Sequence, residues 1–168
     1  MAKMTMVQAI NLALRQEMEK DDRVIVLGED VGKDGGVFRV TDQLFEQFGE
    51  NRVVDTPLAE AGIVGMSIGM AVYGLRPVCE IQFSGFAYQN FHQIENHASR
   101  LRWRTQGALS VPMVLRAPYG GGVRALEHHS ESREAFWAHM PGLKMVIPSG
   151  PRNARALLVS AIRDPDPV

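Results

Sequence analysis

The sequence has little cysteine, little net charge and no long apolar run. Its 168 residues include one cysteine, Cys79, which excludes an internal disulfide and a metal site built from several thiolates. The 18 basic and 19 acidic residues nearly cancel, so no overall field attracts nucleic acid or an anionic membrane. Charged residues interrupt every apolar stretch before about 18 residues accumulate, and the N-terminus does not resemble a signal peptide. We therefore expect a reducing, cytoplasmic setting, with no nucleic-acid partner and no membrane partner.

Short apolar runs of strand length alternate along the chain with helix-length segments. The expected strands are 24–28, 52–55, 76–83, 111–116 and 144–147. The expected helices are 6–20, a short one capped by Thr41 and ending at 48, 59–73, 87–102, 131–139, and a last one capped by Ser149 and ending at 162. This alternation predicts one α/β domain over residues 1–168, with a mostly parallel sheet and helices on both faces.

The expected helix 59–73 has an unusual composition. It is almost wholly apolar and small, and it contains Gly62, Gly65 and Gly69. Glycine costs about 1 kcal/mol in a helix interior, so three of them need a packing reason, most simply another backbone lying close against the helix. The composition therefore predicts a buried helix at an interface.

The carboxyl ends of parallel strands gather ligands, and four segments of this chain should meet there: 29–30, 55–60, 82–86 and 118–129. Glu60 is the most pointed residue among them, because it opens an apolar helix and is therefore both desolvated and near a positive helix end. An acidic residue in the first turn of a helix also commonly serves only to stabilise the helix dipole. The apolar residues on both sides of Glu60 argue for a chemical role instead.

A pair of histidines, His128 and His129, follows the triglycine loop at 120–122. Imidazole can move protons near neutral pH, but adjacent histidines do not give the i, i+4 pair of a helical zinc site. Two interpretations of His129 are therefore open. It has a chemical role, or it is a loop histidine that is hydrogen-bonded or solvated. A metal-dependent hydrolase built on Glu127 and the two histidines is a remote alternative.

Several motifs carry a family resemblance that covers the whole chain. They are LGEDVG (27–32), GGVF (35–38), DTPLAE (55–60), GMSIG (65–69) and PGLK (141–144). Together they resemble the beta subunit of the thiamine-diphosphate-dependent 2-oxo acid dehydrogenases, most closely that of Gram-positive-type pyruvate dehydrogenase. The resemblance implies a transketolase-like pyrimidine-binding fold. It also implies that the glycines after Glu60 pack a subunit interface.

The resemblance assigns roles to particular positions. Glu60 would hydrogen-bond the N1′ atom of the cofactor's aminopyrimidine and so favour the imino tautomer that removes the thiazolium C2 proton. Phe86 occupies the position of the aromatic ring that stacks on the pyrimidine. Leu58 and Gln82 match pocket positions. His129 matches the histidine that serves as proton donor when the acyl group passes to the lipoyl disulfide.

The resemblance also bears on metal ions and partner chains. Asp164 and Asp166, with the carbonyls of Met113, Ala161 and Ile162, fall where relatives hold a structural potassium ion. The chain contains no Gly-Asp-Gly, the motif with which the family binds the cofactor diphosphate through Mg²⁺. The resemblance therefore implies an alpha subunit that supplies Mg²⁺ and the diphosphate side, in an α2β2 heterotetramer.

The implied reaction is oxidative decarboxylation of pyruvate, with acyl transfer to the lipoyl domain of a dihydrolipoyl acyltransferase, and with activity only beside an alpha subunit. A branched-chain 2-oxo acid or acetoin as the substrate is one alternative. A non-catalytic assembly domain that keeps only the interface is another. Relatives continue beyond the sequence that matches 164–168 into a strand and a second α/β domain, so we expect that C-terminal domain of the subunit to be absent from this chain.

Overall fold

Four parallel strands form the centre of the molecule. The computed structural model describes residues 3–168, and its sheet has the order β2-β1-β3-β4. The strands are β1 (Val24–Gly28), β2 (Val53–Asp55), β3 (Arg76–Glu80) and β4 (Val114–Arg116). The predicted α/β fold with a parallel sheet is confirmed, and its strands are shorter than expected, since β3 ends before residue 83 and β4 begins after residue 111.

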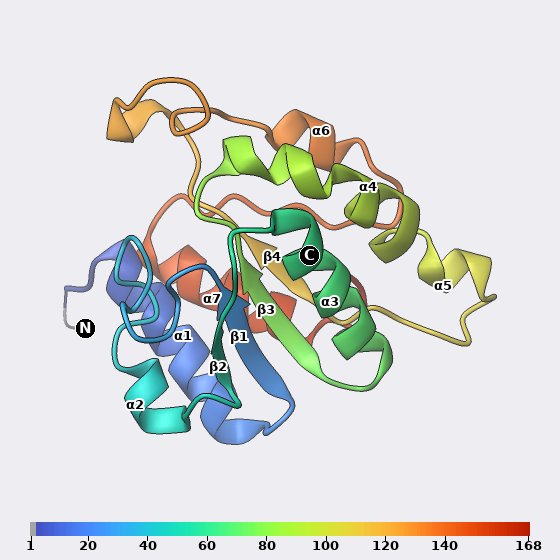
Figure 1. Ribbon diagram of the computed structural model, residues 1–168, viewed down its shortest axis with the longest axis horizontal. Coiled ribbons are helices and arrows are strands. Elements are labelled where there is room, and N and C mark those ends of the chain that lie inside the picture. Colours follow the sequence, from blue (N-terminus) through green and yellow to red (C-terminus); the bar gives the residue numbers. More distant parts are fainter. Residues whose placement is uncertain (1–2) are drawn as a thin grey trace.

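Helices cover both faces of the sheet (Figure 1). One face carries α1 (Met6–Lys20), α7 (Pro151–Arg163) and the short α2 (Leu44–Phe48). The other face carries α3 (Glu60–Val72), which packs against the 3₁₀ segment η1 (Ser84–Asn90). Neighbouring strand residues belong to different core clusters: Val26 and Val78 face α1 and α7, whereas Leu27 and Cys79 face α3. This alternation explains why the strands read as continuous apolar runs.

The first helix forms as its sequence predicts. The side chain of Thr5 accepts a hydrogen bond from the Gln8 backbone, and the Gln8 side chain accepts one from the Thr5 backbone. Two later caps differ from the prediction. The α2 N-cap is Gln43, in a left-handed conformation with φ 64°, instead of Thr41. The α7 N-cap is the extended Gly150 instead of Ser149, with Pro151 in the first turn.

The predicted helix 87–102 is wrong as a continuous element. The chain instead runs through η1, α4 (Phe91–Gln93), the π turn η2 (Ile94–Ala98) and α5 (Leu101–Arg104). The Ser99 amide donates to the Ile94 carbonyl, five residues back, and the Ser99 hydroxyl donates to the Glu95 carbonyl. A serine hydroxyl that bonds the preceding turn competes with the regular helical ladder, which is a physical reason for the break.

The predicted strand 144–147 is also wrong, and the predicted helix 131–139 shortens to α6 (Glu134–Ala138). Val168 lies beside β4, donating to the Met113 carbonyl and accepting from the Leu115 amide. On its other side, Pro167 accepts from the Lys144 amide. Residues 167–168 thus separate the segment 144–147 from β4. A mainly apolar cavity of about 440 Å³ lies between β4, α1, α7 and that segment.

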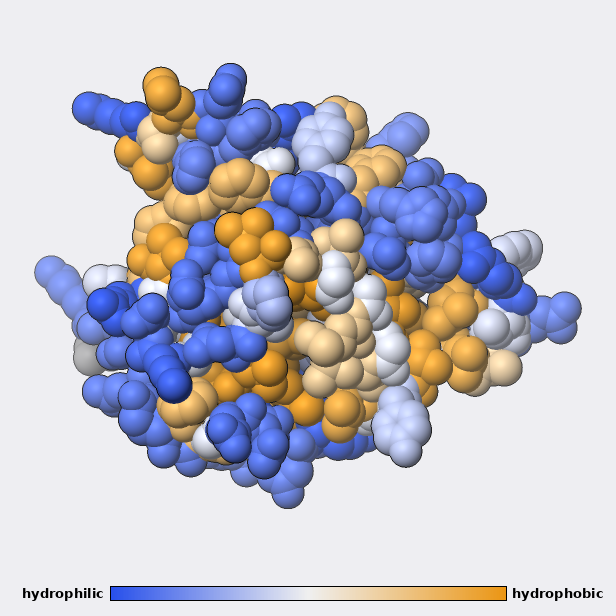
Figure 2. Space-filling view, viewed as in Figure 1, coloured by the Kyte–Doolittle hydropathy of each residue, from blue (hydrophilic) through white to orange (hydrophobic). Residues whose placement is uncertain are grey.

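The face of α3 turned away from the sheet is open. Ile63, Val64 and Ile68 are buried beneath the helix, whereas Met66 is 45% exposed and Tyr73, just after the helix, is 90% exposed. Figure 2 shows apolar and weakly polar residues gathered over the position that α3 occupies in Figure 1. The helix is therefore buried on one side only within residues 3–168. In the same described part, no helix has the length and apolar character needed to cross a bilayer.

Candidate functional site

The four segments expected to meet all lie at one edge of the sheet, which we call the carboxyl edge. Glu29 follows β1, and Glu60 begins α3 shortly after β2. Phe86 lies in η1 after β3, and His129 lies in the loop after β4. Because all four strands are parallel, their ends place these residues on the same side of the fold.

Glu60 is buried at the first position of α3. It is 3% exposed, and its Oε2 atom has no hydrogen-bond partner within residues 3–168. The α3 N-cap, Ala59, provides no side-chain cap, so the amino end of a thirteen-residue helix meets this carboxylate directly. A buried carboxylate oxygen without a donor is costly for the fold, typically by 1–3 kcal/mol or more. Such an oxygen is suited to a ligand that brings its own donor.

Glu29 is a second buried carboxylate, and its local sequence did not mark it as a site residue. It is 7% exposed, and its Oε1 finds no partner among the described residues. Loss of solvation raises the pKa of Glu29, and the negative charges of Glu60 and Asp30 add to that effect. The available signal was its position directly after the fully buried strand β1.

The predicted aromatic and imidazole residues meet in one cluster. The ring centroids of Phe86 and His129 are 5.1 Å apart with an interplanar angle of 88°, and those of Phe83 and His129 are 4.6 Å apart. Phe38 extends the cluster at 5.6 Å from Phe83. These edge-to-face contacts hold aromatic surface at the carboxyl edge, where Phe83 and Phe38 were missed because ring packing is not visible in local sequence.

The remaining predicted pocket residues follow the strand ends at the same edge of the sheet. Gln82 donates from Nε2 to Asp30 Oδ2 at 2.9 Å, which ties the end of β3 to the end of β1. Leu58 is 76% exposed and contributes a free apolar side chain just before α3. The Nδ1 atom of His129 lies 3.2 Å from the Glu127 carbonyl.

The hydrolase alternative has no metal site to support it in the described part of the chain. Within residues 3–168, no group of three or more His, Cys, Asp or Glu side chains is arranged to hold a metal ion. The side chains of Glu127, His128 and His129 therefore do not form such a group.

Three of the five residues assigned to potassium are bound by cations of the protein itself. Lys144 Nζ lies 2.6 and 2.7 Å from the two carboxylate oxygens of Asp164, and Arg102 pairs with Asp166 at 2.5 Å. Arg76 donates to the Ile162 carbonyl. The carbonyls of Met113 and Ala161 also accept backbone hydrogen bonds, from Val168 and Asp164 respectively. These contacts compete with an added potassium ion, which stays a prediction from the resemblance.

Comparisons with known proteins identify the family of the chain. The family model "Transketolase, pyrimidine binding domain" matches residues 2–168. The chain is 55% identical to the pyruvate dehydrogenase E1 component subunit beta of Acholeplasma laidlawii and 54% identical to that of Staphylococcus epidermidis. It is also 54% identical to the 2-oxoisovalerate dehydrogenase subunit beta of Bacillus subtilis. The resemblance expected from the sequence is confirmed.

These matches cover all of this chain but only 51–52% of each relative, so the chain spans about half the length of the curated relatives it matches. Among solved structures, a split-gene transketolase in an inactive beta4 tetramer superposes with a TM-score of 0.76. That match covers 99% of this chain and 50% of the other at 20% identity, so it shows the fold alone. Fold and family model agree, and the chain belongs to the transketolase pyrimidine-binding domain family.

Proposed function

We propose that this chain is the pyrimidine-binding part of a thiamine-diphosphate-dependent 2-oxo acid dehydrogenase, with pyruvate as the substrate. The main observation behind this proposal is that Glu60 is buried at the start of α3 with an unpaired carboxylate oxygen. The names of the relatives support the reaction class, and the aromatic cluster at the same edge supports a planar ring as the ligand.

Glu60 has the properties of a residue that holds a proton on a ligand nitrogen. Its free oxygen can accept a hydrogen bond from a protonated ring nitrogen, and burial strengthens that contact. Phe86 presents ring surface from η1, and η1 packs against the helix that Glu60 begins. Thiamine diphosphate, when bound, supplies the nucleophilic carbon and the electron sink for decarboxylation.

The chain supplies one side of this cofactor site. Glu60, Phe86, Leu58 and Gln82 would hold the pyrimidine, and the absence of Gly-Asp-Gly from the sequence leaves Mg²⁺ and the diphosphate to another chain. The open apolar face of α3, which begins at Glu60, supports an alpha subunit bound there, in an α2β2 heterotetramer. A dihydrolipoyl acyltransferase would receive the acyl group.

The length of the relatives supports a longer subunit with a second domain.

The decisive experiment replaces Glu60 in the enzyme reconstituted with an alpha subunit. Glu60→Ala should lower decarboxylation, measured with an artificial electron acceptor, by about 10²–10⁴-fold, because acid–base help of that size is lost. Glu50→Ala is the matched control, since Glu50 is an exposed glutamate in the turn after α2. Turnover of Glu60→Ala within threefold of wild type would refute the proposal.

The branched-chain alternative stays open because the Bacillus subtilis 2-oxoisovalerate relative is almost as similar as the pyruvate relatives. Competition between pyruvate and 2-oxoisovalerate on the reconstituted enzyme decides between them. We expect pyruvate to give the higher kcat/KM. The reverse preference would assign the chain to branched-chain substrates without changing the role of Glu60.

Binding of thiamine diphosphate separates the enzyme from a non-catalytic assembly domain. Calorimetric titration should show binding to the αβ assembly and a large loss of affinity in Glu60→Ala. No binding in the wild-type assembly would favour the assembly domain.

A further inference from the structure

Gly85 lies where no larger residue fits, directly against the loop that carries the two histidines. A Cβ atom built on Gly85 would fall 2.3 Å from the carbonyl oxygen of His128 and 2.6 Å from its Cα. Cβ atoms do not approach other heavy atoms this closely, and both neighbours here belong to the backbone. The backbone of residue 128 therefore rests on the bare backbone of residue 85.

The conformation of the loop at this contact is itself demanding. His128 has φ 72°, in the left-handed region that non-glycine residues seldom adopt, and such backbone is maintained only where its surroundings fix it. Gly120 donates to the Glu131 carbonyl at 2.9 Å and closes the base of the loop. The Ser84 amide donates to the Pro118 carbonyl at 2.9 Å, so the residue before Gly85 is tied to the start of the same loop.

The contact lies between the two halves of the aromatic cluster. Gly85 immediately precedes Phe86, and His128 immediately precedes His129. The separation of the Phe86 and His129 rings, 5.1 Å, is therefore set by how closely these two backbone segments approach. His128 adds a second contact, with its ring 5.9 Å from Phe86.

We propose that Gly85 is a positioning residue that sets His129 against Phe86 by allowing the His128 backbone to lie on η1. The consequence for the reaction rests on the proposed function. A C–S bond forms between the acyl group and one lipoyl sulfur as the S–S bond breaks, the electron pair of that bond goes to the other sulfur, and this sulfur takes up a proton that His129 would donate. An alanine methyl group at residue 85 must push the loop outward by roughly 1 Å to restore a normal contact, and a misplacement of that size can lower a rate by about 10²-fold.

The loop offers a matched control. Gly122 also lies between residues 120 and 131, and a Cβ atom there would meet nothing within 4 Å among the described residues. Gly122→Ala thus adds the same methyl group to the same loop without displacing it.

The test compares Gly85→Ala with Gly122→Ala in the reconstituted enzyme. Gly85→Ala should lower acyl transfer to a lipoyl domain by about 10–100-fold while decarboxylation with an artificial acceptor stays within threefold of wild type. Gly122→Ala should leave both rates within twofold. If Gly85 acts through His129, Gly85→Ala combined with His129→Ala should be no slower than His129→Ala alone. Equal loss of both reactions in Gly85→Ala, or additive losses in the double variant, would overturn the proposal.

A spectroscopic readout separates failure of this inference from failure of the proposed function. The Cε1 proton of His129, assigned with His129→Ala, should carry a ring-current shift from Phe83 and Phe86 in the chain. Gly85→Ala should move that resonance toward the position of a solvated histidine, and Gly122→Ala should not. An unmoved resonance refutes the positioning role, whereas a moved resonance in an enzyme without acyl-transfer activity refutes only the proposed reaction.

Discussion

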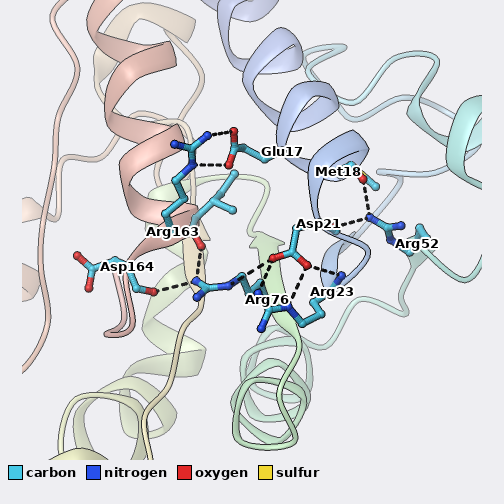
Figure 3. A network of polar contacts seen from close by, with 9 residues as sticks. Glu17, Met18, Asp21, Arg23, Arg52, Arg76, Arg163 and Asp164 are labelled. Carbon is cyan, nitrogen blue, oxygen red and sulfur yellow. Dashed lines mark hydrogen bonds and ion pairs between the residues drawn. The ribbon is translucent and has the colours of Figure 1, made fainter.

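The two edges of the sheet differ in how their acidic side chains are paired. At the edge where the strands begin, which we call the amino edge, Glu17 of α1 and Asp21 just after that helix are paired with arginines (Figure 3). Glu17, whose side chain is 6% exposed, accepts two hydrogen bonds from Arg163 at 2.7 Å each. Asp21 is bound by Arg23 at 2.9 and 2.8 Å. At the carboxyl edge Glu80 has a partner in Arg116, but Glu29 and Glu60 each leave a buried oxygen unpaired.

The pKa values follow this division. A hydrogen bond from Arg163 lowers the pKa of Glu17 at the amino edge. One from Arg23 lowers the pKa of Asp21 from 3.8 to about 2. At the carboxyl edge, desolvation raises the pKa of Glu29. Ionisation of Glu17 and Asp21 therefore favours the fold, whereas ionisation of Glu29 opposes it. The chain thus keeps an unfavourable charge, that of Glu29, at the edge where a ligand would bind, which is a common conflict between stability and activity.

The largest stability effect should come from Asp21→Asn at the amino edge. The pKa of Asp21 is lower in the folded state, so its contribution is present above pH 3.8 and disappears as the pH falls toward about 2. Near neutral pH the variant should lose about 1–2 kcal/mol of unfolding free energy in urea titrations, after allowance for the partial exposure of Asp21. The difference from wild type should shrink steadily below pH 3.8.

Asp22→Asn is the control for that variant. Asp22 is fully exposed and reaches Arg52 at 3.2 Å, which is a surface ion pair. Its loss should change the unfolding free energy by less than about 1 kcal/mol. Equal losses of unfolding free energy in the two variants would show that the Asp21 contacts contribute no more than an exposed ion pair.

Glu29→Gln tests the carboxyl edge and should have the opposite sign. Burial raises the pKa of Glu29 above 4.5 in the folded state, so its ionisation costs stability from pH 4.5 upward, and the cost is complete above that higher value. Glutamine removes the charge, and we expect a gain of about 1 kcal/mol in unfolding free energy at pH 7. Below pH 4.5 Glu29 is protonated in both the folded and the unfolded state. The cost of its charge is then absent, and the gain from glutamine should disappear. A destabilised variant at pH 7 would show that Glu29 is ionised and paired.

Local sequence predicted the features that local forces decide. The apolar run of β1, the capping box at Thr5 and the carboxylate that opens α3 are each visible within a few residues. The strand expected at 144–147 failed because residues 167–168, far along the chain, lie between it and β4. The burial of Glu29 and the closeness of Gly85 to His128 likewise depend on contacts between distant segments, which no periodicity reveals.

The smallest effect should come from Gly69→Ala, on the open face of α3. A Cβ atom at Gly69 meets nothing within 4 Å in the described part of the chain, and alanine favours a helix interior over glycine by about 0.5–1 kcal/mol. The variant should therefore raise the unfolding free energy of this chain by that amount.

The same substitution should act in the opposite direction on assembly. If a partner backbone lies against α3, as the glycines of the sequence indicate, the added methyl group must weaken association with the alpha subunit, measured by analytical ultracentrifugation. Ser160→Ala in α7 is the control: residue 160 is exposed and helical, so alanine should bring a small stability gain without loss of assembly. A Gly69→Ala chain that is more stable and assembles normally would show that the glycine face serves no close contact. Loss of assembly in a more stable chain would extend the conflict between stability and function from the two carboxylates to the helix that Glu60 begins.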